Sequence, residues 1–150
     1  MATENTLILE TTQGNVTIEM RPDLAPLHVE QIKGLVKKGF YDGIVFHRVI
    51  DGFMAQTGCQ QGTGTGGSGK KIKAEFNAEP HVRGTVSMAR AADPNSGDSQ
   101  FFICFDDATF LDGQYTAWGK VIEGMENVDK IKRGEPVNQP DKIIRATMGA

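Results

Sequence analysis

Residues 45–56 read VFHRVIDGFMAQ and place one arginine, Arg48, inside an otherwise apolar segment. The β-branched and aromatic residues of this stretch predict two short strands, over 45–49 and 53–57. If the first strand alternates, Arg48 and Phe46 share one face. Because a buried charge without a partner is costly, Arg48 either belongs to a structural ion pair or faces a cleft. The spacing alone leaves both interpretations open.

The segments before this stretch predict a hairpin and a helix. Apolar and polar residues alternate over 7–20, and Gln13-Gly14 supplies a turn in the middle. Pro26 suits the first turn of a helix, apolar residues recur after it at helical spacing, and Gly39 suits its left-handed end.

Further short strands are expected after this stretch, between clusters of glycine and proline. They cover residues 85–88, 100–105, 117–122 and 142–148, with a brief second helix over 125–131. No linker, repeat or change of composition divides the chain. We therefore expect a mainly β fold, a barrel with helices closing its ends, in a single domain over residues 1–150.

The composition excludes several classes of protein. With 16 basic and 19 acidic residues, the net charge is −3, and the lysines cluster only at 37–38 and 70–73, so nucleic acid is not expected as a partner. No run approaches the roughly 18 apolar residues of a membrane span, and the N-terminus does not read as a signal peptide. Cys59 and Cys104 are expected to be buried free thiols in a reducing compartment. These features predict a cytoplasmic protein, and nothing in them indicates more than a monomer.

A glycine-rich stretch over 62–71 invites a nucleotide-binding interpretation. Such a loop needs a long helix after it, but Pro80 follows too soon, and Lys71 stands where a magnesium-binding serine or threonine is required. A surface loop is therefore favoured. The three histidines, His28, His47 and His81, lack the spacing of zinc ligands, so neither a metal nor a cofactor is expected.

In its motifs the chain resembles the cyclophilins. The matching stretches occur in family order: GFYDG at 39–43, FHRVI at 46–50, GFM with Gln56 at 52–56, SMA at 87–89, SQFFI at 99–103, LDG at 111–113 and GKV at 119–121. The resemblance extends over nearly the whole chain. It implies an eight-stranded antiparallel barrel capped by two helices, and peptidyl-prolyl cis–trans isomerase activity that assists protein folding. Rotation about a peptide bond makes and breaks no bond to carbon, which agrees with the absence of an expected cofactor.

The resemblance also assigns roles to residues. It implies that Arg48 donates to the prolyl nitrogen and that Gln56 contacts the substrate carbonyl and Arg48. The proline ring would lie in a pocket of Phe53, Met54, Phe102 and Leu111. Arg48, Phe53, Gln56 and Phe102 would be catalytic; the residues that would bind substrate are Met54, Ala89, Arg90, Ala91, Gln100, Phe110, Leu111 and Tyr115.

The chain departs from the family pattern at the rim of this pocket. Phe110 stands where cyclosporin-sensitive members carry tryptophan, which implies at most weak cyclosporin binding. Tyr115 replaces a common histidine and Arg90 a common asparagine. The expected partners are proline-containing peptides and folding proteins. A peptide-binding module without turnover is the rival hypothesis, and the retained Arg48 favours the enzyme.

Overall fold

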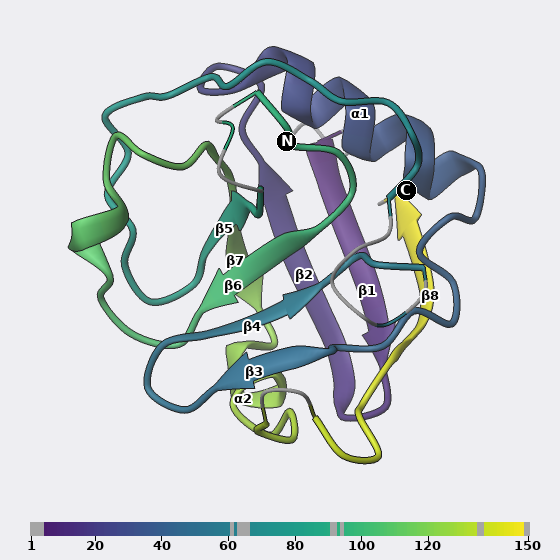
Figure 1. The fold of residues 1–150 in the computed structure, drawn as a ribbon. Helices are drawn as coiled ribbons and strands as arrows, with labels where there is room; N and C mark the ends of the chain where they lie inside the picture. The colour runs from purple at the N-terminus through teal and green to yellow at the C-terminus, as the bar shows by residue number, and fades with distance from the viewer. Residues whose placement is uncertain are drawn as a thin grey trace.

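The computed structural model describes residues 5–60, 62, 67–90, 93, 95–134 and 137–148. Eight strands form one antiparallel sheet in the order β3-β4-β6-β5-β7-β2-β1-β8 (Figure 1). The strands are β1 (Thr6–Thr11), β2 (Gly14–Met20), β3 (Arg48–Ile50), β4 (Met54–Thr57), β5 (Thr85–Met88), β6 (Phe101–Cys104), β7 (Ala117–Glu123) and β8 (Ile143–Met148).

The sheet curls until its two edges meet. The segment before β3 bonds to the start of β8: Gly43 N–H donates to Ile143 O at 2.7 Å, and Phe46 N–H donates to Asp141 O at 2.8 Å. Val49 in β3 also exchanges two backbone hydrogen bonds with Gly134. The expected barrel is therefore confirmed, and these contacts pair part of each edge strand, which would otherwise present unpaired backbone groups.

The interior of the barrel holds the main core. Strand alternation sends Leu7, Leu9, Val16 and Ile18 of the predicted hairpin inward, where each is fully buried. Tyr41, Phe101 and Trp118 also lie inside, and their rings meet edge to face.

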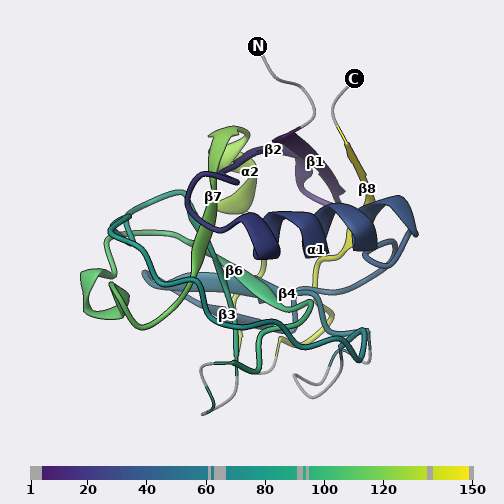
Figure 2. The ribbon, with the colours of Figure 1, turned by 90° about the horizontal axis from the view of Figure 1, so that it is seen from above.

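Helix α1 (Pro26–Lys37) crosses one open end of the barrel, and the short helix α2 (Met125–Val128) lies at the other (Figures 1 and 2). Gly39, at φ +73°, ends α1: its N–H donates to Val36 O, and the next N–H donates to Leu35 O. No helix within the described ranges is long and apolar enough to cross a lipid bilayer.

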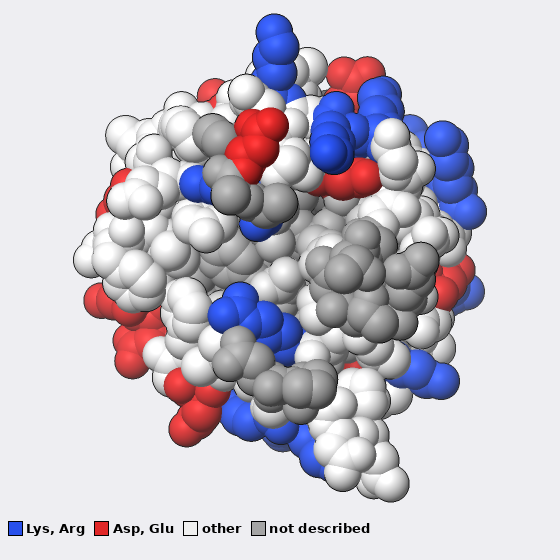
Figure 3. All heavy atoms as spheres, viewed as in Figure 1, with Lys and Arg blue, Asp and Glu red and all other residues white. Residues whose placement is uncertain are grey.

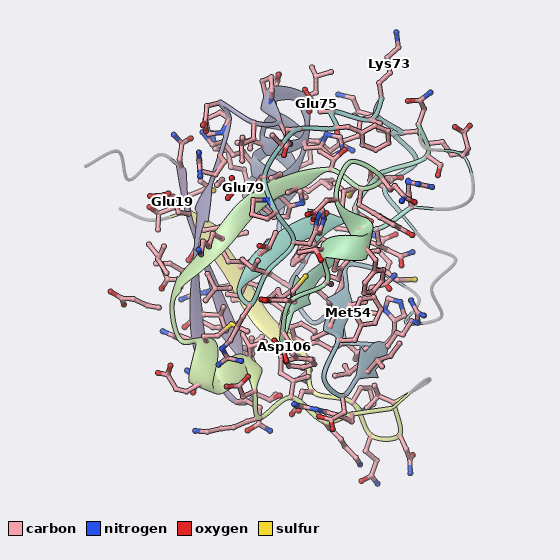
Figure 4. All side chains as sticks on the ribbon, turned by 90° about the vertical axis from the view of Figure 1, so that its left-hand side faces the viewer. Glu19, Met54, Lys73, Glu75, Glu79 and Asp106 are labelled. Atoms are coloured by element: carbon pink, nitrogen blue, oxygen red, sulfur yellow. The ribbon has the colours of Figure 1, made fainter. Side chains whose placement is uncertain are left out.

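The N-terminus of α1 is capped from a distant part of the chain. The Glu75 carboxylate accepts the backbone N–H groups of Leu27 at 3.1 Å and of His28 at 2.8 Å, and it lies 2.7 Å from His28 Nδ1. Figure 4 shows Glu75 at this end of the helix. This contact fixes the long segment between β4 and β5 against α1.

Two predictions about local structure need correction. The strand expected over 45–49 begins only at Arg48, and Phe46 lies in the main core together with Val49. The backbone before Arg48 pairs with Asp141 instead of β4, so the alternation that would place Phe46 beside Arg48 does not extend that far. The second helix ends at Val128, before the predicted Ile131, and a 3-10 turn, η2 (Thr109–Leu111), was not expected.

The buried His28 predicts a dependence of stability on pH. Burial lowers the pKa of its imidazole below the ordinary 6.5, and this outweighs the opposite effect of Glu75. As the pH falls below 6.5, the unfolded chain binds the proton first, so the free energy of unfolding decreases. Urea unfolding at pH 7.5 and pH 5 measures the decrease, and a His28→Gln variant should show a smaller one. If the free energy of unfolding decreased equally in the native chain and in His28→Gln, His28 would not be the cause.

Candidate active site

One row of side chains crosses the outer face of four neighbouring strands. Arg48 of β3 is paired with Gln56 of β4, Gln56 with Phe102 of β6, and Phe102 with Ser87 of β5. Their inward-facing neighbours Val49, Ala55 and Ile103 lie in the main core, as strand alternation requires. The register of the sheet therefore places the arginine, an amide and an aromatic ring side by side on the outside of the barrel.

Hydrogen bonds hold the polar end of this row. Arg48 Nη1 lies 3.4 Å from Gln56 Oε1, and Gln56 Nε2 donates to Gln100 Oε1 at 3.0 Å. Gln56 thus accepts from the arginine and donates to Gln100. Arg48 and Gln56 are half-buried, which leaves both accessible to a peptide.

The apolar end of the row is a second core cluster, separate from the barrel interior. Its buried members are Met54, Phe102, Cys104, Ala108 and Leu111, and Ile50, Phe53, Ala89 and Tyr115 pack against them partly exposed. Met54 lies two residues before Gln56 in β4 and so faces the same, outer side of the sheet. Figure 3, viewed from the side of β3, β4 and β6, shows basic groups near the middle of this face.

Aromatic pairs form the rim of the cluster. The rings of Phe53 and Phe110 lie 5.6 Å apart, and 67% of Phe110 is exposed. Tyr115 meets Phe102 edge to face at 5.8 Å. The Arg90 guanidinium lies 4.6 Å from the centre of the Tyr115 ring and donates to Gln114 O at 2.8 Å. The side chain of Arg90 therefore supports Tyr115 and extends the rim.

The family model described as "Cyclophilin type peptidyl-prolyl cis-trans isomerase/CLD" matches residues 6–148. The chain belongs to this family. A Brucella suis protein named probable peptidyl-prolyl cis-trans isomerase is 56% identical over 164 aligned positions, covering 98% of this chain and 84% of its own. Peptidyl-prolyl cis-trans isomerase B of Bacillus subtilis is 42% identical, over 83% of this chain and 87% of its own.

Solved cyclophilin structures share the fold. A cyclophilin from Hirschia baltica superposes with a TM-score of 0.91 at 34% identity, covering 99% of this chain and 75% of its own. A cyclophilin-type isomerase from Cryptosporidium parvum was solved in the presence of the dipeptide Ala-Pro. It superposes with a TM-score of 0.89 at 28% identity, covering 97% of this chain and 99% of its own.

The residues that the cyclophilin resemblance indicated come together in space. Phe53, Met54, Phe102 and Leu111 belong to the single outer cluster, next to Arg48 and Gln56. The backbone N–H of Ala89 donates to Gln100 O at 2.9 Å, which places both beside the row. Ala91 lies outside the described residues. Their roles in catalysis and binding stay predictions.

Three residues behind Phe102 were not predicted as part of the site. His81 is buried, with its ring nearly parallel to that of Phe102 and the two centroids 6.3 Å apart. Asp112 Oδ1 accepts the His81 backbone N–H at 2.7 Å and lies 3.0 Å from Nδ1. His81 Nε2 lies 2.9 Å from the Ser87 hydroxyl. Because a carboxylate only accepts, Nδ1 donates to Asp112, and in that tautomer Nε2 accepts from the Ser87 hydroxyl.

This Asp–His–Ser order is also that of a hydrolase triad, but the geometry excludes that chemistry. Ser87 is completely buried, so no carbonyl group can reach its hydroxyl. The buried Cys104 is not a nucleophile either, because burial raises the pKa of its thiol to about 12. Neither Ser87 nor Cys104 can therefore supply a nucleophile on this face.

Proposed function

We propose that the chain catalyses cis–trans isomerisation of X–Pro bonds in peptides and proteins and so assists protein folding. The observation that carries this proposal is the row across β3, β4 and β6. It sets a half-buried arginine beside a separate apolar cluster on the outer face of the barrel.

The chemistry requires a hydrogen-bond donor and a pocket. Rotation about the peptide bond has a barrier of about 20 kcal/mol, because it breaks amide resonance. As the amide twists, the lone pair of the prolyl nitrogen localises and becomes a better acceptor. Arg48 would donate to that lone pair and bind the twisted amide more strongly than the planar one.

One hydrogen bond does not account for the whole acceleration. A millionfold increase requires roughly 8 kcal/mol of preference for the transition state. Phe53, Met54, Phe102 and Leu111 would contribute by holding the proline ring. Gln56 would bind the substrate carbonyl while it orients Arg48, and Gln100 would orient Gln56 in turn.

The remaining features of the site bear on its ligands. The solved relative with Ala-Pro supports a proline-containing peptide as the substrate. The backbone at Ala89 and Arg90 would bind the extended chain beside the proline. Phe110 cannot donate a hydrogen bond as an indole does, so we expect at most weak cyclosporin binding.

The setting of this activity also stays a proposal. We propose a single isomerase domain over residues 1–150, acting as a monomer. We propose the cytoplasm as its location, since the two cysteines are buried and form no disulfide, as a reducing compartment allows.

The test is the rate of cis-to-trans isomerisation of a short Ala-Pro peptide, followed by NMR exchange with the purified chain at catalytic concentration. We expect strong acceleration. Binding of the peptide without acceleration would show that the barrel is a peptide-binding module, and the proposal would fail.

A further inference from the structure

The structure brings together the two lysine clusters that are far apart in the sequence. Lys37 and Lys38 lie at the C-terminal end of α1, and Lys70 lies on the segment between β4 and β5. Gln31 Nε2 on α1 donates to Lys70 O at 2.8 Å, so this segment lies along the helix. Basic side chains gather over α1 in Figure 3.

A groove of about 780 Å³ follows α1 at this place. Its apolar lining includes Pro22, Pro26, Leu27 and Ile72. Its charged lining consists of the basic residues Lys33, Lys37, Lys38 and Lys70, hereafter the groove lysines, and of one acidic residue, Glu30.

The groove lysines have no acidic partner within the part of the chain that the structure describes. Lys33 Nζ donates to the neutral Asn5 Oδ1 at 2.7 Å, and the other three side chains are exposed. Lysines near a helix C-terminus stabilise the helix dipole, which accounts for Lys37 and Lys38. That reason does not extend to Lys33 or Lys70. With four lysines against Glu30, and with Asp98 bonded to the lining residues Ser68 and Gln31, the groove is still more basic than the chain as a whole, whose net charge is −3.

The groove is continuous with the segment that enters the candidate active site. Ile72 N–H donates to Gly97 O at 2.8 Å. The Asp98 carboxylate accepts from Gly69 N–H at 2.9 Å and from the Ser68 hydroxyl. Asp98 lies two residues before Gln100, which bonds to Gln56. The wall of the groove formed by residues 68–72 is therefore hydrogen-bonded to the segment that carries Gln100 of the candidate active site.

We propose that this groove binds acidic residues of the polypeptide whose proline occupies the pocket, which gives the enzyme a preference for X–Pro segments near Asp or Glu. This inference rests on the proposed isomerase function. A polypeptide fits better than a nucleic acid, because nucleic-acid sites use arginine forks and stacked aromatic rings, and neither lines the groove. The negative net charge of the chain would also repel a long polyanion.

The experiment compares Ala-Pro peptides that carry a block of four Asp residues with peptides that carry four Asn residues. The block is placed before the proline in one pair and after it in the other. Exposed ion pairs are individually weak, so several together should raise kcat/KM for the better acidic peptide about fivefold at low salt. The preference should disappear in about 0.5 M salt, where charges are screened.

The deciding variant replaces all four groove lysines: Lys33→Gln, Lys37→Gln, Lys38→Gln and Lys70→Gln. We expect it to lose the preference for the acidic peptide and to turn over the Asn peptides normally. The matched control replaces four exposed lysines elsewhere, Lys120, Lys130, Lys132 and Lys142, by Gln, with the same change of net charge. It should keep the preference.

Equal loss in the control variant would overturn the proposal, because the effect would then come from net charge alone. Tighter binding of a single-stranded oligonucleotide or of anionic phosphatidylserine vesicles, competing with the Asp peptide, would overturn it too. If the native chain turns over no peptide at all, the isomerase proposal fails. The groove is then tested separately by calorimetric binding of the Asp peptide to the native chain and to both variants.

Discussion

An Arg48→Ala variant is expected to lose about a hundredfold in kcat/KM for an Ala-Pro peptide, because removal of one positioned donor to a transition state typically costs that much. The loss corresponds to about 2.7 kcal/mol of transition-state stabilisation. The substitution removes no main-core residue, so the fold should be retained. NMR exchange measures the rates, and circular dichroism and thermal unfolding check the fold.

An Arg48→Lys variant separates charge from geometry. Lysine keeps the positive charge but replaces the planar fork with a single ammonium group that bonds less well to Gln56. We expect kcat/KM of Arg48→Lys to be about tenfold higher than that of Arg48→Ala. If folded Arg48→Ala protein kept the native kcat/KM, Arg48 would have no part in the mechanism.

The second large effect is expected at Asp112, which acts through His81 on Phe102. Without the carboxylate, His81 loses the acceptor for its backbone N–H and for Nδ1. The ring that lies against Phe102 keeps its contact with Ser87 but can reorient more easily. A shift of the pocket wall should lower kcat/KM about tenfold in Asp112→Ala. Asp112→Asn keeps an acceptor oxygen and should stay within about threefold of the native value.

The chain contains a matched control for this variant. The Glu75 carboxylate contacts both the backbone N–H and Nδ1 of His28, just as Asp112 contacts those of His81. Glu75 and His28 lie at α1 and are not members of the outer cluster. Glu75→Ala should destabilise the fold and leave kcat/KM within about twofold. NMR ring-flip rates of Phe102 should rise in Asp112→Ala only. Equal loss of kcat/KM in both variants would reduce the role of Asp112 to general stability.

Much of the fold follows from short-range patterns. Alternation in the hairpin over 7–20, Pro26 and Gly39 at the ends of α1, and the short apolar runs for β4, β5 and β6 all agree with the structure. These signals are local, because side-chain direction and glycine backbone preference depend on neighbouring residues. The strand expected from residue 45 begins late for the opposite reason: the backbone of Phe46 pairs with Asp141, far along the chain.

The same distinction explains what was missed in the site. The pocket residues were reached through resemblance to a family, since nothing local distinguishes the outward Phe102 from the inward Phe101. His81 has no sequence signal that would relate it to Asp112, because a loop and two strands separate them. The groove lysines come from two parts of the chain that are distant in the sequence, and the contact between Gln31 and Lys70 O helps to bring them together.

The way in which the barrel closes has a consequence for how the protein is made. Strand β1 pairs with β8, Leu7 with Met148, and the segment before β3 bonds to Asp141 and Ile143. A ribosome makes β4 and β6, which carry Gln56 and Phe102, well before it makes β8, so the growing chain has two open sheet edges until residues 141–148 emerge. Such long-range pairing slows folding and leaves strand edges exposed to association with other chains. A protein proposed to help others past a slow folding step can therefore complete its own barrel only after its last strand has been translated.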